Sequence, residues 1–179
     1  MMRVRVVGPE SAGKTTLAMA LARYFRCRFV PEFARSWLES RAAGSVTAAI
    51  TLADLTDIAA GQAALEDETA SWGGNLLICD TDPLSTSLWS EALVGLPLPG
   101  REGEAGLLRR YGLTLLMSPA PWVPDPVRYQ PDPEARAVFF VRCRQVYPDA
   151  YLLDGGWDAR FSAAVEAINR ARRTPDGQG

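Results

Sequence analysis

The feature that most constrains the fold is a stretch near the start of the chain, residues 6–17, which reads VVGPESAGKTTL. Residues 3–7, RVRVV, which include the first two residues of this stretch, are typical of a short buried strand. After it, Leu17, Leu21 and Phe25 recur at helical spacing. The stretch therefore joins a strand to a helix through a turn that has a glycine at each end.

The rest of the chain repeats this alternation. Four more short apolar runs predict strands at 27–30, 76–79, 113–117 and 151–153. Helical patterns lie between and after them, at about 33–43, 52–72, 84–93, 133–146 and 161–168. Strands that alternate with helices predict an α/β fold with a five-stranded parallel sheet and helices on both faces. We expect one domain over residues 1–173, with 174–179 as a flexible tail.

Composition excludes several classes of protein. The formal net charge of -2 and the pI of about 5.3 argue against a general nucleic-acid binder. No apolar run reaches the ~18 residues of a membrane span, and no secretory signal precedes the first strand, so we expect a cytoplasmic protein. The chain has no histidine, which removes histidine-based catalysis and histidine metal sites. The oligomeric state stays open.

The glycine-flanked stretch matches the Walker A pattern, Gly-x-x-x-x-Gly-Lys-Thr, in the required place between strand and helix. Its backbone N–H groups and the helix N-terminus suit the phosphates of ATP. Lys14, the only lysine in the chain, is expected to neutralise the β- and γ-phosphates, and Thr15 to ligate Mg²⁺. The predicted nucleotide-binding residues are Gly8, Pro9, Glu10, Ser11, Ala12, Gly13, Lys14, Thr15 and Thr16.

Polar residues follow two of the other strands, and parallel strands bring such positions to one edge of the sheet. Asp80 closes an apolar strand, where we expect the second carboxylate that organises Mg²⁺. Asp82 either faces the substrate or caps the next helix. Glu32 is placed to orient or deprotonate an acceptor hydroxyl, and Arg35 to hold that carboxylate or a phosphate. The alternative for Glu32 and Arg35 is a structural ion pair on the exposed first turn of the helix that follows.

A segment with six prolines in sixteen residues, 118–133, cannot form a regular helix. We predict that about 118–136 forms a lid, with Arg128 and Arg136 stabilising the charge of the transferring phosphoryl group. Two tryptophans, Trp89 and Trp122, are candidates for contact with the substrate, although single tryptophans more often lie in the core.

Several motifs together resemble the kinase domain of NadR-type nicotinamide riboside kinases. They are VGPESAGKTTLA, VPEFAR, AAGQAALE, DTDPLSTSLW and PWVPDPVR, in an order that runs from about residue 3 to residue 160. The Asn-Lys-x-Asp motif with which Ras-type GTPases read the base is excluded, because the only lysine of the chain is Lys14 in the Walker A stretch.

This resemblance implies a P-loop NTPase fold and transfer of the γ-phosphate of ATP to the 5′-hydroxyl of nicotinamide riboside. It places Glu32, Arg35, Asp80 and Asp82 at the reaction centre, with Trp89 and Trp122 near the nucleoside. The family often carries an aspartate before the tryptophan and Asp-Gly-x-Arg after it, where this chain reads SPAPW and DPVR. NadR proteins also carry an adenylyltransferase domain with a histidine motif. This chain has neither the length for that domain nor any histidine, so we expect the kinase part alone here. A kinase for another nucleoside or nucleoside monophosphate, or a regulatory P-loop ATPase, remains an alternative.

Overall fold

A parallel sheet of five strands forms the centre of the molecule in the computed structural model, which describes residues 1–42, 49–100, 108, 110–123 and 132–173. The strand order is β2-β3-β1-β4-β5. The strands are β1 (Met2–Val7), β2 (Arg28–Val30), β3 (Leu76–Asp80), β4 (Leu113–Met117) and β5 (Tyr151–Leu153). All four neighbouring pairs are parallel, which confirms the predicted α/β fold with a five-stranded parallel sheet.

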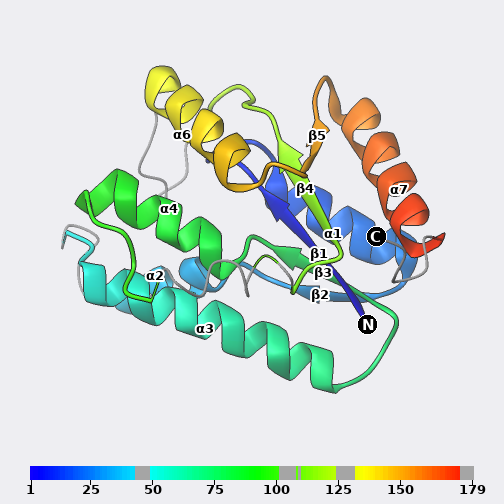
Figure 1. Cartoon of the computed structure of the whole chain (residues 1–179), viewed down its shortest axis with the longest axis horizontal. Coiled ribbons are helices and arrows are strands. Elements are labelled where there is room, and N and C mark those ends of the chain that lie inside the picture. The colour runs from blue at the N-terminus through cyan, green and yellow to red at the C-terminus, as the bar shows by residue number, and fades with distance from the viewer. Residues whose placement is uncertain (43–48, 101–107, 109, 124–131, 174–179) are drawn as a thin grey trace.

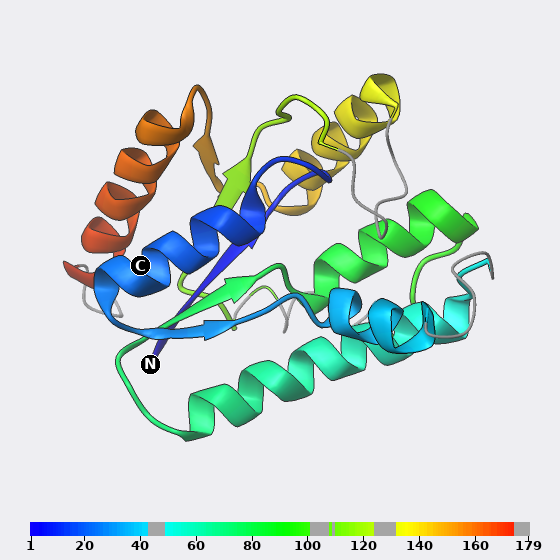
Figure 2. The same cartoon turned by 180° about the vertical axis from the view of Figure 1, so that it is seen from behind.

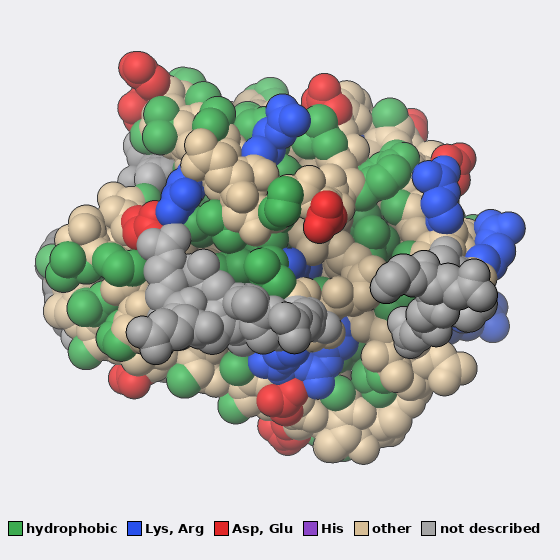
Figure 3. Space-filling view, viewed as in Figure 1, with side chains coloured by type: hydrophobic (Ala, Val, Ile, Leu, Met, Phe, Trp, Pro, Cys, Tyr) green, Lys and Arg blue, Asp and Glu red, His purple; other side chains and the backbone are tan. Residues whose placement is uncertain are grey.

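Helices cover both faces of the sheet (Figures 1 and 2). They are α1 (Lys14–Phe25), α2 (Phe33–Ala42), α3 (Leu52–Ser71), α4 (Pro83–Val94), α6 (Pro133–Val146) and α7 (Trp157–Arg173). Helices α1 and α7 lie on one face, and α3, α4 and α6 lie on the other, with α2 packed on α3. None of these helices in the described ranges is both long and apolar enough to cross a membrane. On the face shown in Figure 3, acidic and basic side chains are interspersed with apolar ones.

The strands alternate their side chains between two apolar layers, which explains why their sequences are largely apolar. Val4 and Val6 of β1 pack with α1 and α7, whereas Val7 packs with α4 and α6. In β3, Ile78 faces the first layer and Leu77 faces the second. A strand that is covered on both faces leaves no position for a solvent-facing polar residue.

The crossing pattern places a crevice at the carboxyl ends of β1 and β3. These strands are neighbours, but the chain leaves β1 for α1 on one face and leaves β3 for α4 on the other. Ligands of open α/β sheets bind where two adjacent connections diverge in this way. Residues 8–13 after β1 and residues 81–82 after β3 therefore lie at the position where this fold class forms its sites.

Capping side chains fix the starts of α3 and α6. Thr51 and Asp54 form a capping box at the start of α3, and Asp132 caps α6 with Pro133 in its first turn. An apolar residue of α6, Val138, lies outside the core and is 65% exposed. The buried stripe of α6 instead contains Arg136, Phe139 and Cys143. A charged residue takes the buried position there because its guanidinium finds partners inside the fold.

One charge is buried in the middle of the central strand. The Arg5 side chain points into the α3–α4–α6 layer, where its guanidinium pairs with the carboxylate of Asp82 and donates to the Thr114 hydroxyl. The rings of Tyr111 and Tyr147 each lie with their centroid 4.5 Å from the guanidinium carbon. Arg5 is 2% exposed and Asp82 is 0% exposed, so the pair is compensated entirely by protein groups.

We predict that Arg5→Met lowers the free energy of unfolding by about 3–5 kcal/mol, because it leaves the buried Asp82 carboxylate without its cation. Urea denaturation measures the change. The matched control is Arg142→Met, whose ion pair with Glu91 is partly exposed and whose loss should cost about 1 kcal/mol or less. Equal losses in the two variants would show that the buried pair contributes no more to the free energy of unfolding than the partly exposed pair.

Candidate functional site

The loop between β1 and α1 wraps closely against the end of β4. Gly8 has φ +139°, and a Cβ built there would lie 2.6 Å from the carbonyl oxygen of Met117. Gly13 caps α1 in the left-handed region with φ +87°. Only glycine adopts both conformations without strain or collision. The loop therefore presents the free N–H groups at the start of α1 to the crevice, as an anion site requires.

Lys14 is the first residue of α1 and returns across its own loop, where its ammonium donates to the carbonyl oxygen of Pro9 at 2.9 Å. Thr15 and Thr16 follow it on the wall of the same pocket. The ammonium group therefore lies over the loop whose N–H groups face the crevice, as the Walker A pattern predicts.

A buried arginine from α7 holds this loop from behind. The guanidinium of Arg160, 7% exposed, donates to the carbonyl oxygens of Ala12 and Ser118, each at 3.2 Å, and to that of Gly155 at 2.7 Å. It also donates to the Ser118 hydroxyl at 2.8 Å, which in turn donates to Asp154. The ends of β4 and β5 and the nucleotide loop are thus joined through one charged side chain.

The segment after β4 lies against the same loop. The backbone N–H of Val123 donates to the Ser11 hydroxyl at 2.7 Å, and that hydroxyl donates to the carbonyl oxygen of Pro121. Arg136 of α6 is 5% exposed and donates to the carbonyl oxygen of Ala120 at 2.7 Å. Its guanidinium carbon lies 5.4 Å from the centroid of the Trp122 ring. These contacts join the first part of the predicted lid to the nucleotide loop.

Asp80, at the end of β3, has the properties of a metal ligand. It is 1% exposed, and within the described chain neither carboxylate oxygen is at hydrogen-bonding distance from a partner. Its pKa is raised to about 6, mainly by burial and also by the nearby charge of Glu32, while the Thr15 hydroxyl, Lys14 and Arg35 act in the opposite direction. A buried carboxylate with open oxygens beside a threonine hydroxyl fits a hard cation such as Mg²⁺.

The described residues contain no group of three or more His, Cys, Asp or Glu side chains that could hold a metal ion. A cation at Asp80 and Thr15 would therefore complete its coordination with nucleotide phosphate oxygens and water, which is the usual arrangement for Mg²⁺ in nucleotide sites.

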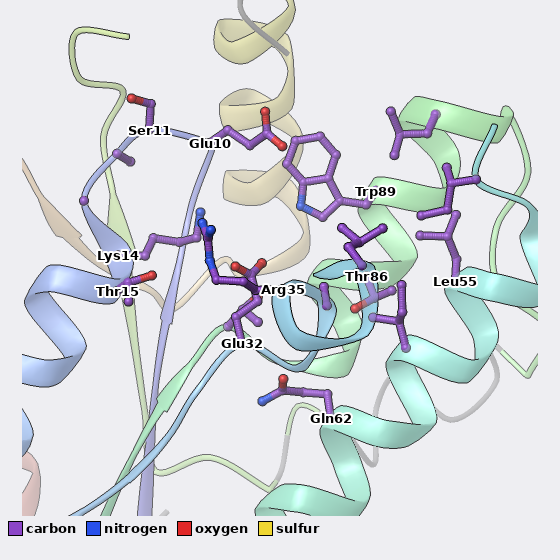
Figure 4. Close-up of a pocket in the computed structure, with 18 of the residues that line it drawn as sticks. Glu10, Ser11, Lys14, Thr15, Glu32, Arg35, Leu55, Gln62, Thr86 and Trp89 are labelled. Atoms are coloured by element: carbon purple, nitrogen blue, oxygen red, sulfur yellow. The ribbon is translucent and has the colours of Figure 1, made fainter. Parts of the chain in front are cut away.

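A pocket extends from the nucleotide loop into the space between α2, α3 and α4 (Figure 4). At one end it is lined by residues 10–16 together with Glu32, Arg35 and Thr81. The other end is largely apolar and is formed by Ala34, Leu38, Ile50, Leu55, Ile58 and Leu93, with Thr86, Trp89 and Gln62 as its polar or aromatic members. The pocket thus joins an anion-binding end to an end that suits an organic ring.

The predicted pair Glu32 and Arg35 reaches this pocket. Both side chains line it, and Figure 4 shows them gathered with Lys14 at the nucleotide end. Glu32 and Arg35 also act electrostatically on Asp80, which places them beside the candidate metal position. Arg35 has a second neighbour in Glu39, one helical turn away at 4.0 Å.

Asp82 takes the capping role that the sequence left open. One carboxylate oxygen accepts from the Ser85 backbone N–H at 2.9 Å, from the Ser85 hydroxyl and from the Tyr147 hydroxyl, while the other pairs with Arg5. The residue is fully buried and does not line the pocket. Its predicted catalytic and substrate roles are therefore not supported, because both of its carboxylate oxygens are already occupied by protein groups.

The two predicted tryptophans differ in position. Trp89 lines the pocket and stacks on Phe139, with ring centroids 4.2 Å apart, so its orientation is fixed by α6. Trp122 lies against Arg136 and does not line the pocket. Arg128, much of the predicted lid and the 174–179 tail lie outside the described residues.

Two site residues escape simple sequence reasoning, Gln62 and Arg160. Gln62 is 1% exposed and lines the pocket, although the polar residues around it suggest a solvated helix face. Each lies in the buried stripe of its helix, at i+4 from Ile58 for Gln62 and at i-4 from Ala164 for Arg160. A polar residue that continues an apolar stripe is the signal that identifies them.

Comparison with known proteins places this geometry among nucleotide-binding domains. A family profile described as an AAA domain matches residues 3–152. The chain is 25% identical over 170 residues to the trifunctional NAD biosynthesis/regulator protein NadR of Salmonella typhimurium, covering 92% of this chain and 41% of that protein. It is 29% identical over 125 residues to the protein of the same name in Escherichia coli, covering 70% and 30%.

A solved structure shows the same fold. The crystal structure of a NadR protein in complex with NR superposes with a TM-score of 0.74 at 22% identity, covering 99% of this chain and 51% of that one. The resemblance to NadR proteins that the motifs indicated is therefore confirmed, as is the P-loop NTPase fold. The chain spans less than half the length of the curated relatives it matches.

We predict that Asp80→Asn stabilises the metal-free protein in a pH-dependent way. A folded-state pKa of about 6 against an ordinary 3.8 means that ionising Asp80 disfavours the native state, by on the order of 3 kcal/mol once the pH exceeds 6. The stability advantage of Asp80→Asn should thus appear between pH 4 and 6 and be complete at pH 8. Denaturation in EDTA at pH 4 and pH 8 measures it. Asp149→Asn, at an exposed position, is the control.

We predict that Arg160→Met weakens ATP binding at least ~10-fold, because the carbonyl oxygens of Ala12 and Ser118 lose a charged donor and the nucleotide loop loses its support. Calorimetry with a non-hydrolysable ATP analogue measures the affinity. Arg170→Met, on the same helix but almost three turns further on, is the control. An unchanged affinity in Arg160→Met would show that the loop keeps its shape without this side chain.

Proposed function

The chain belongs to this AAA domain family, and we propose that it is an ATP- and Mg²⁺-dependent kinase that phosphorylates the 5′-hydroxyl of nicotinamide riboside to give nicotinamide mononucleotide. The observation that carries the proposal is the continuous pocket from the nucleotide loop to an apolar chamber. A nucleotide switch needs the loop alone, whereas a kinase needs a second, organic-lined cavity beside the γ-phosphate position. The chamber between α2, α3 and α4 provides that cavity.

The residues at the nucleotide end suit phosphoryl transfer, in which positioning and charge stabilisation supply most of the rate. The N–H groups at the start of α1 bind phosphate oxygens, and the Lys14 ammonium balances the charge that spreads over the transferring group. Thr15 and Asp80 would hold Mg²⁺, which when bound bridges phosphate oxygens and neutralises their charge. Glu32 lines the nucleotide end of the pocket beside Arg35, where it would accept a hydrogen bond from the acceptor hydroxyl.

The acceptor end suits a nucleoside whose base is a cationic ring. Trp89 offers an indole held in place by its stack on Phe139, and aromatic faces attract cations. Glu10 lies near Trp89 in the pocket and adds a negative charge there (Figure 4). The NadR protein whose structure contains NR supports the same class of acceptor. We extend the proposal to a kinase domain over residues 1–173, a lid over about 118–136, a tail at 174–179 and action in the cytoplasm.

We predict that the protein releases ADP from ATP only when nicotinamide riboside is present, with Mg²⁺ required. A coupled ADP assay over a panel of nicotinamide riboside, deoxynucleosides and nucleoside monophosphates measures this. Lys14→Ala should lower kcat by at least ~10³-fold, because the transition state loses a cation at the phosphates.

A native thermal unfolding curve for Lys14→Ala is the control that the fold survives. Full activity in that variant would remove the mechanism. Slow ATP hydrolysis that no acceptor stimulates would instead favour a regulatory ATPase, and preference for another member of the panel would replace the acceptor.

A further inference from the structure

The motif AAGQAALE lies in the middle of α3 and places a buried glutamine at the wall of the acceptor pocket. The Gln62 side-chain oxygen accepts a hydrogen bond from the backbone N–H of Phe33 at 2.9 Å. Its amide nitrogen donates to a carboxylate oxygen of Glu66 at 3.3 Å. Gln62 is 1% exposed, so these partners decide its orientation.

Glu66 anchors the other end of this chain of hydrogen bonds. It is 0% exposed, and the Tyr111 hydroxyl lies 2.8 Å and 2.7 Å from its two oxygens. The guanidinium groups of Arg3 and Arg110 each lie 3.7 Å from one of them. A buried carboxylate with this many partners has one low-energy position, so Gln62 is held by a fixed support.

The start of α2 is held by two neighbouring residues of α3. Gln62 binds the Phe33 amide, and the Phe33 ring packs so closely on Gly61 that an added Cβ would lie 2.2 Å from it. The Phe33 N–H belongs to the same planar peptide group as the Glu32 carbonyl. A bond to that N–H therefore fixes the backbone of Glu32 and, with it, the direction in which the Glu32 side chain leaves the chain.

We propose that Gln62, supported by Glu66, is a positioning residue for the acceptor half of the site, and that it acts by holding Glu32 toward the acceptor hydroxyl. This inference rests on the proposed kinase function. It explains why a glutamine and a glutamate occupy the buried stripe of α3, where apolar residues would pack at no desolvation cost. The desolvation cost of these two buried polar side chains is offset if they hold a reacting group within a fraction of an ångström, because small misplacements lower rates strongly.

The proposal predicts a loss confined to the acceptor side. Gln62→Met keeps the length and volume of the side chain but removes both hydrogen bonds. We expect its kcat/KM for nicotinamide riboside to fall at least ~10-fold, as misplacement of a catalytic group does. Binding of a non-hydrolysable ATP analogue without acceptor should stay within ~2-fold of the unsubstituted protein, a readout that a general loss of structure would move.

Substitutions at Glu66, which does not line the pocket, test the support without touching the acceptor. Glu66→Gln retains groups that bond both Gln62 and Tyr111 and should keep kcat/KM within ~3-fold. Glu66→Leu breaks the chain of hydrogen bonds and should reproduce the Gln62→Met loss. Thr69→Val is the control for a lost buried hydrogen bond in the same helix, because the Thr69 hydroxyl donates to the backbone of its own helix at Leu65. It should leave both kinetics and ATP-analogue binding unchanged.

The outcomes separate the two proposals. If the unsubstituted protein phosphorylates no nucleoside of the panel, the proposed function fails and this inference fails with it. If that protein is active and Gln62→Met matches it in kcat and in both KM values, the inference alone is wrong. The inference is also wrong if Gln62→Met loses ATP-analogue binding in parallel, or if Glu66→Gln and Glu66→Leu lose acceptor turnover equally, because either result would indicate a general structural role.

Discussion

The charge of Arg5 in the middle of the central strand is the constraint from which much of the interior follows. A guanidinium that is 2% exposed requires a partner inside the molecule, and Asp82 supplies it from the start of α4. The same carboxylate caps α4, so the ion pair fixes the helix that forms one wall of the pocket. The rings of Tyr111 and Tyr147 both pack against the cation and help to keep it out of water.

The polar interior continues from this ion pair to the pocket proposed for the acceptor. Tyr111 covers Arg5 with its ring and bonds Glu66 with its hydroxyl, and Glu66 supports Gln62 at the wall of the pocket. The first turn of α2 is thereby tied to the central strand through side chains alone. At the nucleotide end of the pocket Arg160 is the buried support, because it joins the loop after β1 to the ends of β4 and β5. Both halves of the site rest on buried polar groups.

Sequence reasoning recovers the features that are encoded locally. The nucleotide loop is specified by glycines and a lysine within eight residues, because backbone conformation and helix N-terminus are both short-range properties. The strands follow from apolar runs, and the start of α6 from Asp132 and Pro133. Glu32 and Asp80 follow from the rule that the carboxyl ends of parallel strands converge. None of these needs knowledge of a distant partner.

The remaining features depend on partners far away in the chain. Gln62 bonds a residue 29 positions away, and Arg160 bonds one 148 positions away. A local pattern contains neither partner. From such a pattern a polar residue such as Gln62 would be placed on the surface and an apolar residue such as Val138 in the core, whereas the structure has them the other way round. The phosphate donor can therefore be inferred from one short segment. The proposed acceptor site depends on α2, α3 and α4 together, so its shape follows only from how those helices are held against one another.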